Sequence, residues 1–292
     1  MIYMATGALV APGVHAIAKG LGETMSAGQA AWARFFFQLA FLLPFIWVSH
    51  GGRIPAPSLA HAVRGLLLAG AALSFFWALH HMPIANCAAI FFVEPLLLTV
   101  ISALFLGEPI GWRRVTAVAV GFVGALIVIR PSFDAVGPAA FLPLVCALCF
   151  AVYLAITRHQ AGRETALATQ FWVCVFSAAA LTVFVAAGTA ASVDVLRASW
   201  PAPWEWVLLG AMAVIALITQ ALAIHACRLA PAGVLAPFQY LEIFGSILLG
   251  ALIFSELPDM LTLLGTAIII GSGLYVFRRE QVIARKDRLR QG

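Results

Sequence analysis

The chain has 292 residues, of which 63% are hydrophobic and only 10% are charged, and its mean hydropathy is +1.01. Soluble domains are about 45–50% apolar and about 25% charged, so this composition excludes an ordinary soluble fold and indicates a lipid environment. The net charge of +5 could favour nucleic acid, but the basic residues are scattered over short joints and a tail, which argues against that partner.

Ten apolar segments long enough to cross a bilayer follow one another along the chain. A helix needs about 17–25 residues to span a hydrocarbon core of about 30 Å. The segments lie at residues 4–21, 29–49, 65–81, 85–106, 114–130, 139–157, 166–188, 205–226, 233–254 and 260–277. The first one lacks a basic leading region, so it predicts a retained span and not a cleavable signal. The sequence therefore predicts an all-α integral membrane protein with ten transmembrane helices.

The distribution of Lys and Arg predicts the orientation of these segments. With both termini in the cytoplasm, thirteen of the seventeen basic residues fall on the inner side, and only Lys19, Arg130 and Arg197 fall outside. Arg34 lies inside the second segment, where snorkelling to the outer interface is the favoured interpretation and pairing with a substrate carboxylate is the other. Residues 279–292 form a basic cytoplasmic tail, which we expect to be attracted to anionic lipid headgroups.

The two halves of the chain repeat one another. A shift of 148 residues aligns Pro83 with Pro231, Glu94 with Glu242, Glu108 with Glu256 and Arg130 with Arg278, and a shift of 141 aligns Gln29 with Gln170. Each half holds five segments, and because five is odd the second half enters the membrane from the opposite side. The sequence thus predicts two inverted five-helix repeats, residues 1–138 and 139–278, with a substrate site near the bilayer midplane between them.

The pattern of Glu94-Pro95 and Gly107-Glu108-Pro109, followed by a Gly-rich fifth segment, resembles the drug/metabolite transporter superfamily of the EamA type. The second half departs from it, because Ser255-Glu256 stands where the first half has Gly-Glu. The resemblance covers the whole chain and, within the superfamily, is greatest to bacterial amino acid exporters, including the aromatic amino acid exporter. It implies a multi-pass protein of the bacterial inner membrane that exports amino acids, aromatic ones above all, and related small metabolites by alternating access.

Glu94 and Glu242 each lie about 15 Å into an apolar segment, at the bilayer midplane. A charge there costs at least about 2.5–3.5 kcal/mol, so both must face protein or a water-filled cavity. One interpretation is that they border the translocation path and bind a substrate ammonium group or a proton. The other is that each bonds a neighbouring helix or a carbonyl freed near a proline, as Pro95 would free that of Phe91.

Helical spacing and the repeat extend this pair to a set of candidate substrate-binding residues around a mostly aromatic cavity, suited to a flat solute with one or two charged groups. For each aromatic residue alone, packing or lipid contact is the competing role, and for each histidine it is a structural one. The set is Glu94, Glu242, Tyr153, Gln239, Trp77, His225, Phe91, Phe238 and His15.

Other functions find less support in the sequence. No nucleotide-binding loop, metalloprotease motif or Ser/His/Asp set can be assembled, so neither an enzyme nor a nucleotide-driven pump is predicted, and no cofactor or metal. The Cys146 and Cys149 spacing lacks a second cluster. The runner-up is proton-coupled efflux of aromatic cationic drugs. The small-residue ladder Ala117, Gly121 and Ala125 predicts close helix packing, within a monomer or between copies.

Overall fold

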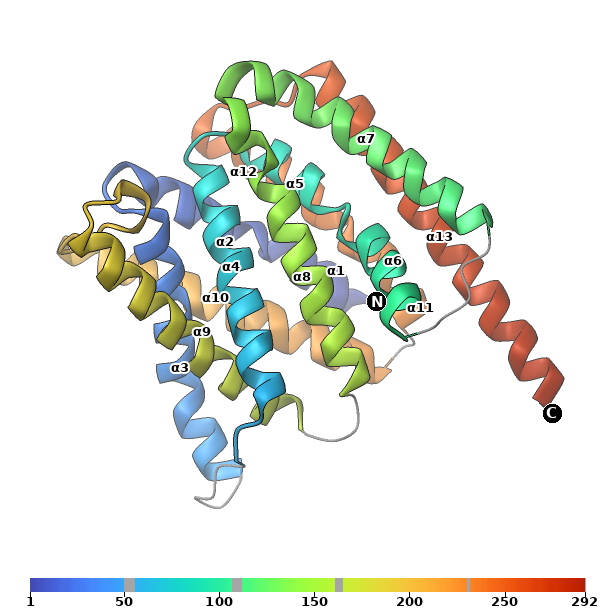
Figure 1. The fold of residues 1–292 in the computed structure, drawn as a ribbon, viewed down its shortest axis with the longest axis horizontal. Helices are drawn as coiled ribbons and strands as arrows, with labels where there is room; N and C mark the ends of the chain where they lie inside the picture. The colour runs from blue at the N-terminus through green and yellow to red at the C-terminus, as the bar shows by residue number, and fades with distance from the viewer. Residues whose placement is uncertain (50–55, 107–111, 161–164, 230–231, 292) are drawn as a thin grey trace.

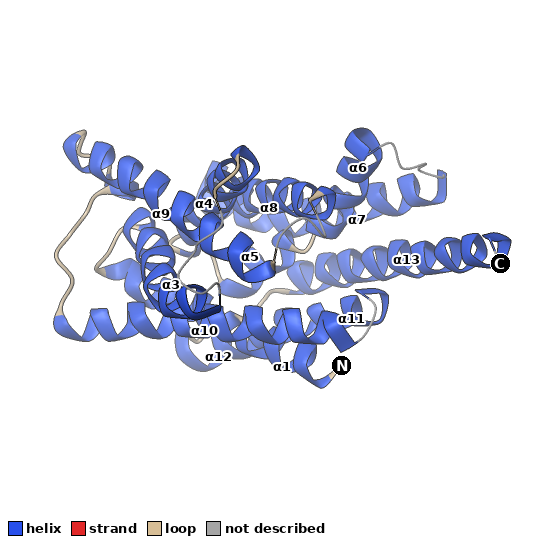
Figure 2. Ribbon diagram, turned by 90° about the horizontal axis from the view of Figure 1, so that it is seen from below, coloured by secondary structure: helices blue, strands red, loops and turns tan. Residues whose placement is uncertain are grey.

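The computed structural model describes residues 1–49, 56–106, 112–160, 165–229 and 232–291, and these residues form helices joined by short turns, without any strand (Figures 1 and 2). The predicted all-α class is therefore confirmed. The elements in chain order are α1 (Ile2–Val10), α2 (Pro12–Gly20), η1 (Leu21–Glu23), α3 (Ala27–Ser49), α4 (Leu59–Leu79), α5 (Ile84–Phe91), α6 (Glu94–Leu106), α7 (Trp112–Val136), η2 (Gly137–Phe141), α8 (Leu142–His159), α9 (Ala166–Ala190), η3 (Asp194–Leu196), α10 (Pro203–Leu229), α11 (Ala232–Gln239), α12 (Leu241–Phe254) and α13 (Met260–Gln291).

Some residues used in the sequence argument lie outside this described part. They are Arg53, Gly107-Glu108-Pro109, Arg163 and Pro231.

Three of the predicted segments are interrupted where a proline follows or lies close by. Pro12 opens α2, a position that suits proline because the first helical residue needs no amide donor. Pro95 is the second residue of α6, after a break at residues 92–93, and Pro237 lies two residues before the end of α11. The interruptions before α6 and α12 occupy corresponding places in the two halves of the chain.

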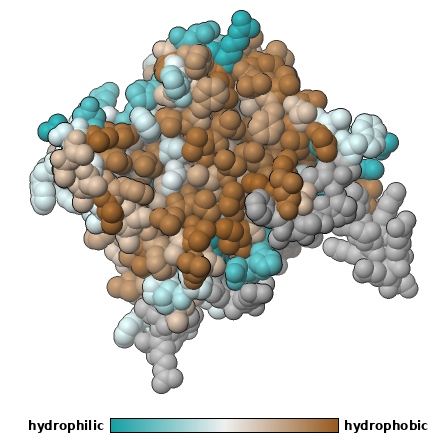
Figure 3. All heavy atoms as spheres, in the orientation of Figure 1, coloured by the Kyte–Doolittle hydropathy of each residue, from teal (hydrophilic) through white to brown (hydrophobic). Residues whose placement is uncertain are grey.

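The surface of the bundle is apolar around its middle. Large hydrophobic side chains such as Leu104, Leu252 and Val207 are 70–75% exposed. Figure 3 shows hydrophobic residues across the middle of one face and hydrophilic ones near its margins. Water would solvate such a belt poorly, so it marks a lipid-facing surface.

Length and composition single out eight candidate membrane spans among the described residues, where the sequence predicts ten. The difference has two sources. Residues 112–159 count as one stretch of 48 although they contain α7 and α8, and α1 and α2 are only nine residues each, too short to count alone.

Two pairs of helices run antiparallel along the bundle. On one edge α7 lies beside α13 (Figure 1), with Gly124 against Gly265 and Gly121 against Ser272. The small-residue ladder on α7 thus serves packing within this chain. The second pair is α3 with α9, where the indole N–H of Trp32 donates to the hydroxyl of Thr182 at 2.8 Å.

The interior is formed by helices from both halves of the chain. α4 packs against α8 and α9, while α10 packs against α1, α2 and α3. The largest buried hydrophobic cluster draws residues from all of these helices except α1, including Phe35, Phe76, Cys146 and Leu209. A mostly apolar cavity with a few polar side chains lies within this arrangement.

One end of the bundle is closed by polar contacts between distant segments, which we call the Lys19 latch. The ammonium group of Lys19 donates to the two carboxylate oxygens of Glu256 at 2.6 and 2.8 Å and to the carbonyl of Met82 at 2.8 Å. At the same end the side-chain amide of Gln29 donates to the carbonyl of Ser199 at 2.7 Å. The contacts to Glu256 and Ser199 tie the first half of the chain to the second.

Candidate functional site

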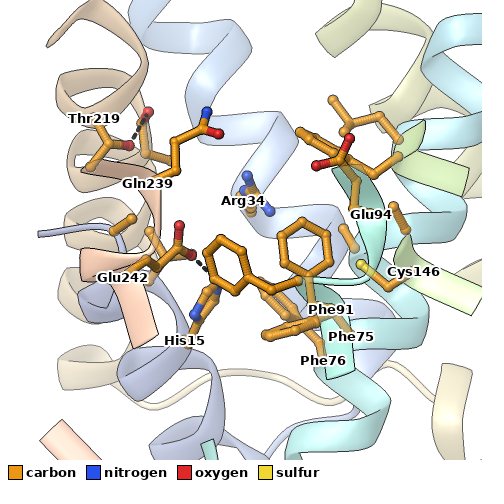
Figure 4. A pocket seen from close by; sticks show the side chains of 18 residues that line it. His15, Arg34, Phe75, Phe76, Phe91, Glu94, Cys146, Thr219, Gln239 and Glu242 are labelled. Carbon is orange, nitrogen blue, oxygen red and sulfur yellow. Dashed lines mark hydrogen bonds and ion pairs between the residues drawn. The ribbon is translucent and has the colours of Figure 1, made fainter. Parts of the chain in front are cut away.

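A cavity of about 250 Å³ lies between the two halves of the chain (Figure 4). Its wall takes residues from α2, α3, α4, α5, α6, α8, α10, α11 and α12, and from the joints beside them. The lining residues are Ala11, Val14, His15, Arg34, Leu68, Ala71, Ala72, Phe75, Phe76, Phe91, Phe92, Glu94, Cys146, Phe150, Ala216, Thr219, Gln239 and Glu242. An apolar cavity with a few polar groups is the usual form of a small-molecule site.

Two carboxyl groups face the cavity from opposite sides (Figure 4). Glu94 is the first residue of α6, and Glu242 is the second residue of α12, so each follows an interruption between two half-helices. Helix N-termini favour negative charge, because their amide groups and the helix dipole point positive ends toward it. Each break therefore places an acid at a helix N-terminus, where its ionised form gains support.

The partners of these acids are few. Among the described residues, Oε1 of Glu94 is buried and has no hydrogen-bond partner, so this oxygen makes no bond to a freed carbonyl there. Glu242 has a histidine beside it, since its Oε1 lies 4.0 Å from Nε2 of His15. Both acids line the cavity, and in the described part of the chain only Glu242 of the two has a polar side chain beside it.

Arg34 reaches the same cavity from α3, and in Figure 4 its side chain lies between the two acids. Its guanidinium carbon stands 5.3 Å from the ring centre of Phe35 and 6.0 Å from that of Phe76. Its Nε is buried without a hydrogen-bond partner, and no acid of the described chain comes within 4.0 Å of its nitrogens. The structure therefore places Arg34 at the cavity, where snorkelling had been the favoured expectation.

Aromatic rings form a continuous wall. The His15 and Phe75 rings are 4.6 Å apart, those of Phe75 and Phe91 are 5.9 Å apart, and those of Phe91 and Phe150 are 5.6 Å apart. Centroid distances of 4.5–7 Å are those that aromatic pairs prefer. Such a wall offers flat faces to a flat ligand.

The sequence matches the EamA-like transporter family over residues 1–130 and 137–278. The chain belongs to the EamA-like transporter family. The resemblance seen in the sequence is thereby confirmed, and the chain is a multi-pass membrane protein of that family.

Curated relatives of this EamA-like transporter carry different substrates. An S-adenosylmethionine uptake transporter of Rickettsia bellii is 30% identical over 269 residues, which cover 91% of this chain and 88% of that protein. A riboflavin transporter of Rhizobium johnstonii is 29% identical, with 89% of this chain and 84% of the relative covered. A pseudopaline exporter of Pseudomonas aeruginosa is 27% identical, with 92% of both covered. None of these names reports aromatic amino acid export.

A solved crystal structure of a protein with 19% sequence identity superposes with a TM-score of 0.59. The match covers 92% of this chain and 94% of that one. At this identity the similarity concerns the fold alone.

Five of the nine candidate residues line the cavity of this EamA-like transporter, and four do not. Those on the wall are Glu94, Glu242, Gln239, Phe91 and His15. Tyr153 lies one helical turn beyond the wall, and its ring is tilted against that of Phe150, with the centroids 5.5 Å apart. The other three point elsewhere: Trp77 lines a separate pocket near His80, His225 meets the ring of Tyr3 at 4.7 Å, and Phe238 packs against a cluster of Met4, Ala226 and Leu235.

Several wall residues were missed by the sequence argument. Phe75, Phe76, Phe92 and Phe150 are apolar residues in apolar segments, so each taken alone resembles a lipid-facing ring. A signal did exist on α4, where Leu68, Ala72, Phe75 and Phe76 recur at helical spacing. Among the described residues, no three His, Cys, Asp or Glu side chains gather as a metal site would require.

Proposed function

We propose that this chain is a secondary transporter that moves small metabolites bearing a cationic group and a flat ring across the bacterial inner membrane. The observation that carries the proposal is the cavity, in which Glu94 and Glu242 stand on opposite sides of a wall of phenylalanines in edge-to-face contact. Acids at membrane depth are costly unless they serve a ligand, an ion or a buried partner. A cationic solute with a ring would satisfy both features.

Ten membrane-crossing segments in two halves fit the helices better than eight. Each interrupted pair counts as one segment, and α7 and α8 count separately. In the first half the segments are α1–α2, α3, α4, α5–α6 and α7, and in the second they are α8, α9, α10, α11–α12 and α13. The family match over residues 1–130 and 137–278 supports the same division into residues 1–138 and 139–278, with 279–292 as a tail.

Helix contacts support an inverted repeat. If the five segments of one half correspond in order to those of the other, each contact between two segments should recur between their two counterparts. α4 packs on α8 and α9, and its counterpart α10 packs on α1 and α3. α3 with α9 and α7 with α13 are counterparts in contact, and α5 contacts α12, which belongs to the counterpart segment α11–α12. The first two of these pairs run antiparallel, as opposite insertion requires.

This arrangement supports alternating access. Two similar halves of opposite orientation can exchange shapes, so that a state closed at one end has a counterpart closed at the other. The Lys19 latch closes one end, which carries the joints predicted to face outward. We therefore place both termini in the cytoplasm and assign this structure to a state closed toward the outside.

S-adenosylmethionine is the first solute to test. It combines an adenine ring with ammonium and sulfonium groups, and it is the substrate named for relatives at 28–30% identity. The rings of the wall offer stacking partners for adenine, and the acids offer partners for the two cations. Uptake is the direction that those names report.

Export of aromatic amino acids is the second candidate. The same rings would hold an aromatic side chain, and either acid would hold the ammonium group. The direction of net flux follows the gradient that drives it, so the same alternating-access cycle can carry out uptake or export. Proton-coupled efflux of a planar cationic drug would use the same acids but would leave Arg34 unfavourably placed beside a cation.

Flux measurements with purified protein in liposomes test the proposal. We expect saturable movement of labelled S-adenosylmethionine, compared with phenylalanine, tryptophan, riboflavin and ethidium, each with and without a pH gradient. Protein-free liposomes serve as the control. Flux confined to ethidium would favour the drug-efflux alternative, and flux confined to riboflavin would contradict a cationic substrate.

A further inference from the structure

The position of Arg34 assigns it a role that the proposed function does not contain. We propose that its guanidinium group is the receptor for a carboxylate of the substrate. Arg34 would thereby select amino acid derivatives over cations and neutral solutes that lack this group. The inference rests on the proposed function, because it concerns ligand choice in the same cavity.

The guanidinium N–H groups of Arg34 donate no hydrogen bond to any residue of the described chain. Its planar group is held by the rings of Phe35 and Phe76, at 5.3 and 6.0 Å. Contacts with aromatic faces fix a guanidinium without using its N–H groups. Its Nε is buried and has no hydrogen-bond partner among the described residues, and the side chain lines the cavity. The geometry is that of a prepared anion receptor.

The acids of the cavity do not fill this role. Glu94 and Glu242 line the same space, yet neither is within ion-pair distance of Arg34. A buried guanidinium without an anion is costly, and a carboxylate matches its paired donors with two parallel hydrogen bonds. A ligand carboxylate would therefore supply what the protein leaves open.

The positive charge of Arg34 has no counterpart in the second half of the chain. Glu94 and Glu242 correspond to one another at a shift of 148 residues, whereas the position that corresponds to Arg34 at a shift of 141 is Val175. A cationic group can thus meet an acid from either half, but a carboxylate can meet its receptor from one half only. The substrate would keep one orientation while the halves exchange shapes around it.

Charge balance favours a particular kind of amino acid derivative. With its acids ionised, the cavity carries two negative charges and one positive charge. S-adenosylmethionine carries the opposite set, namely an ammonium, a sulfonium and a carboxylate. A simple amino acid has one charge of each sign and would leave one acid without a cationic partner.

The test compares each solute with the same solute lacking its carboxylate. One pair is S-adenosylmethionine and its decarboxylated analogue, and the other is phenylalanine and 2-phenylethylamine. Half-saturating concentrations are measured in liposomes for the natural protein, Arg34→Gln, Arg34→Lys and Arg130→Gln. Arg130 is an exposed arginine on α7 outside the cavity, so Arg130→Gln controls for loss of a positive charge.

We expect the natural protein to favour the carboxylate-bearing member of at least one pair by about ten- to hundredfold, as hydrogen bonds between charged groups do. Arg34→Gln should remove that preference while the decarboxylated member still moves. Arg130→Gln should keep it. Arg34→Lys should retain a part, because a lysine keeps the charge but loses the paired donors.

The outcomes separate the two proposals. If the natural protein moves neither pair, the proposed function fails and this inference fails with it. If it moves one pair and Arg34→Gln keeps the preference, or if no preference exists, only the role of Arg34 is overturned. If Arg34→Gln does not yield a monodisperse protein, Arg34→Lys decides, and an unchanged preference in that variant overturns the inference.

Discussion

At the scale of residues, we expect substitutions of the two cavity acids to lower transport activity without lowering stability. Glu94→Gln and Glu242→Gln should each lower the rate of saturable flux at least about tenfold, because each removes a charge-assisted contact with the substrate. Oε1 of Glu94 has no partner in the described chain, so Glu94→Gln should leave the unfolding temperature in detergent equal or higher.

Glu23→Gln provides the control for the acids, because Glu23 is exposed near the Lys19 end and outside the cavity. It should change neither flux nor unfolding temperature. Normal flux in both cavity variants would remove the acids from the site. A fall in flux that tracks a fall in unfolding temperature would assign them a structural role.

A site residue can be predicted from the sequence when its polarity differs from that of the residues around it. Glu94 and Glu242 stand out because a charge in an apolar run is costly and needs a reason. Phe75 and Phe150 give no such contrast, since a ring on the cavity wall and a ring facing lipid look alike in sequence. Arg34 stood out as well, but snorkelling competed with cavity contact, and only the packing of α3 decides between them.

At the scale of elements, the contact between α7 and α13 makes a prediction about stability. A Cβ added at Gly265 would lie 2.6 Å from the carbonyl oxygen of Gly124 and 2.5 Å from Cγ2 of Val128. Backbone cannot yield as a flexible side chain does, so Gly265→Ala should destabilise the folded protein by about 1–3 kcal/mol. Thermal unfolding in detergent would measure it.

Gly271→Ala is the matched control, on the same helix. A Cβ there would meet no atom within 4 Å. Alanine is the better helix former by about 0.8–1 kcal/mol, so this variant should be neutral or slightly more stable. Equal unfolding temperatures for the two variants would show that α7 and α13 do not pack as closely as these contacts require.

Helix positions followed from the apolar segments, but helix interruptions did not. The predicted segment at residues 85–106 contains α5, a break and α6, and the segment at 233–254 contains α11, a break and α12. Hydropathy cannot register these breaks, because Phe92, Val93 and Tyr240 are themselves apolar or aromatic. Pro95 hinted at one of them, since proline removes a backbone donor inside a helix.

At the scale of the whole molecule, the Lys19 latch should hold the outer end closed. Lys19→Met removes the ion pair with Glu256 and the bond to Met82. The contact is partly buried and worth about 1 kcal/mol, so the open population should rise about fivefold. Cys87 can report this change, because it is fully buried in α5, just after Met82.

The measurement is the rate at which a membrane-impermeant thiol reagent labels Cys87 in a protein whose other four cysteines are alanine. Glu256→Gln should raise the rate as Lys19→Met does, and the double variant should raise it no further. Additive effects of the two substitutions would contradict a shared contact. Glu23→Gln, at the same end, should leave the rate unchanged.

The family could be predicted from the sequence, because the motif of Glu94-Pro95 and Gly107-Glu108-Pro109 is recognisable without a structure. The inverted repeat stays a prediction. Substrate choice was less accessible. The residues that line the cavity come from nine helices and meet only in the folded chain, and among relatives at 27–30% identity the names report three different substrates.

The breaks before Glu94 and Glu242 have a mechanical consequence. A continuous helix tilts as one rod, but a helix interrupted at mid-depth can swing its two arms separately about the joint. Each acid lies at the start of the helix that follows the break. If the acids bind the ligand, the helix that precedes the break can move and open a passage at its end of the molecule while the acid stays in place. Loading and release would then need only half of a span to move at a time.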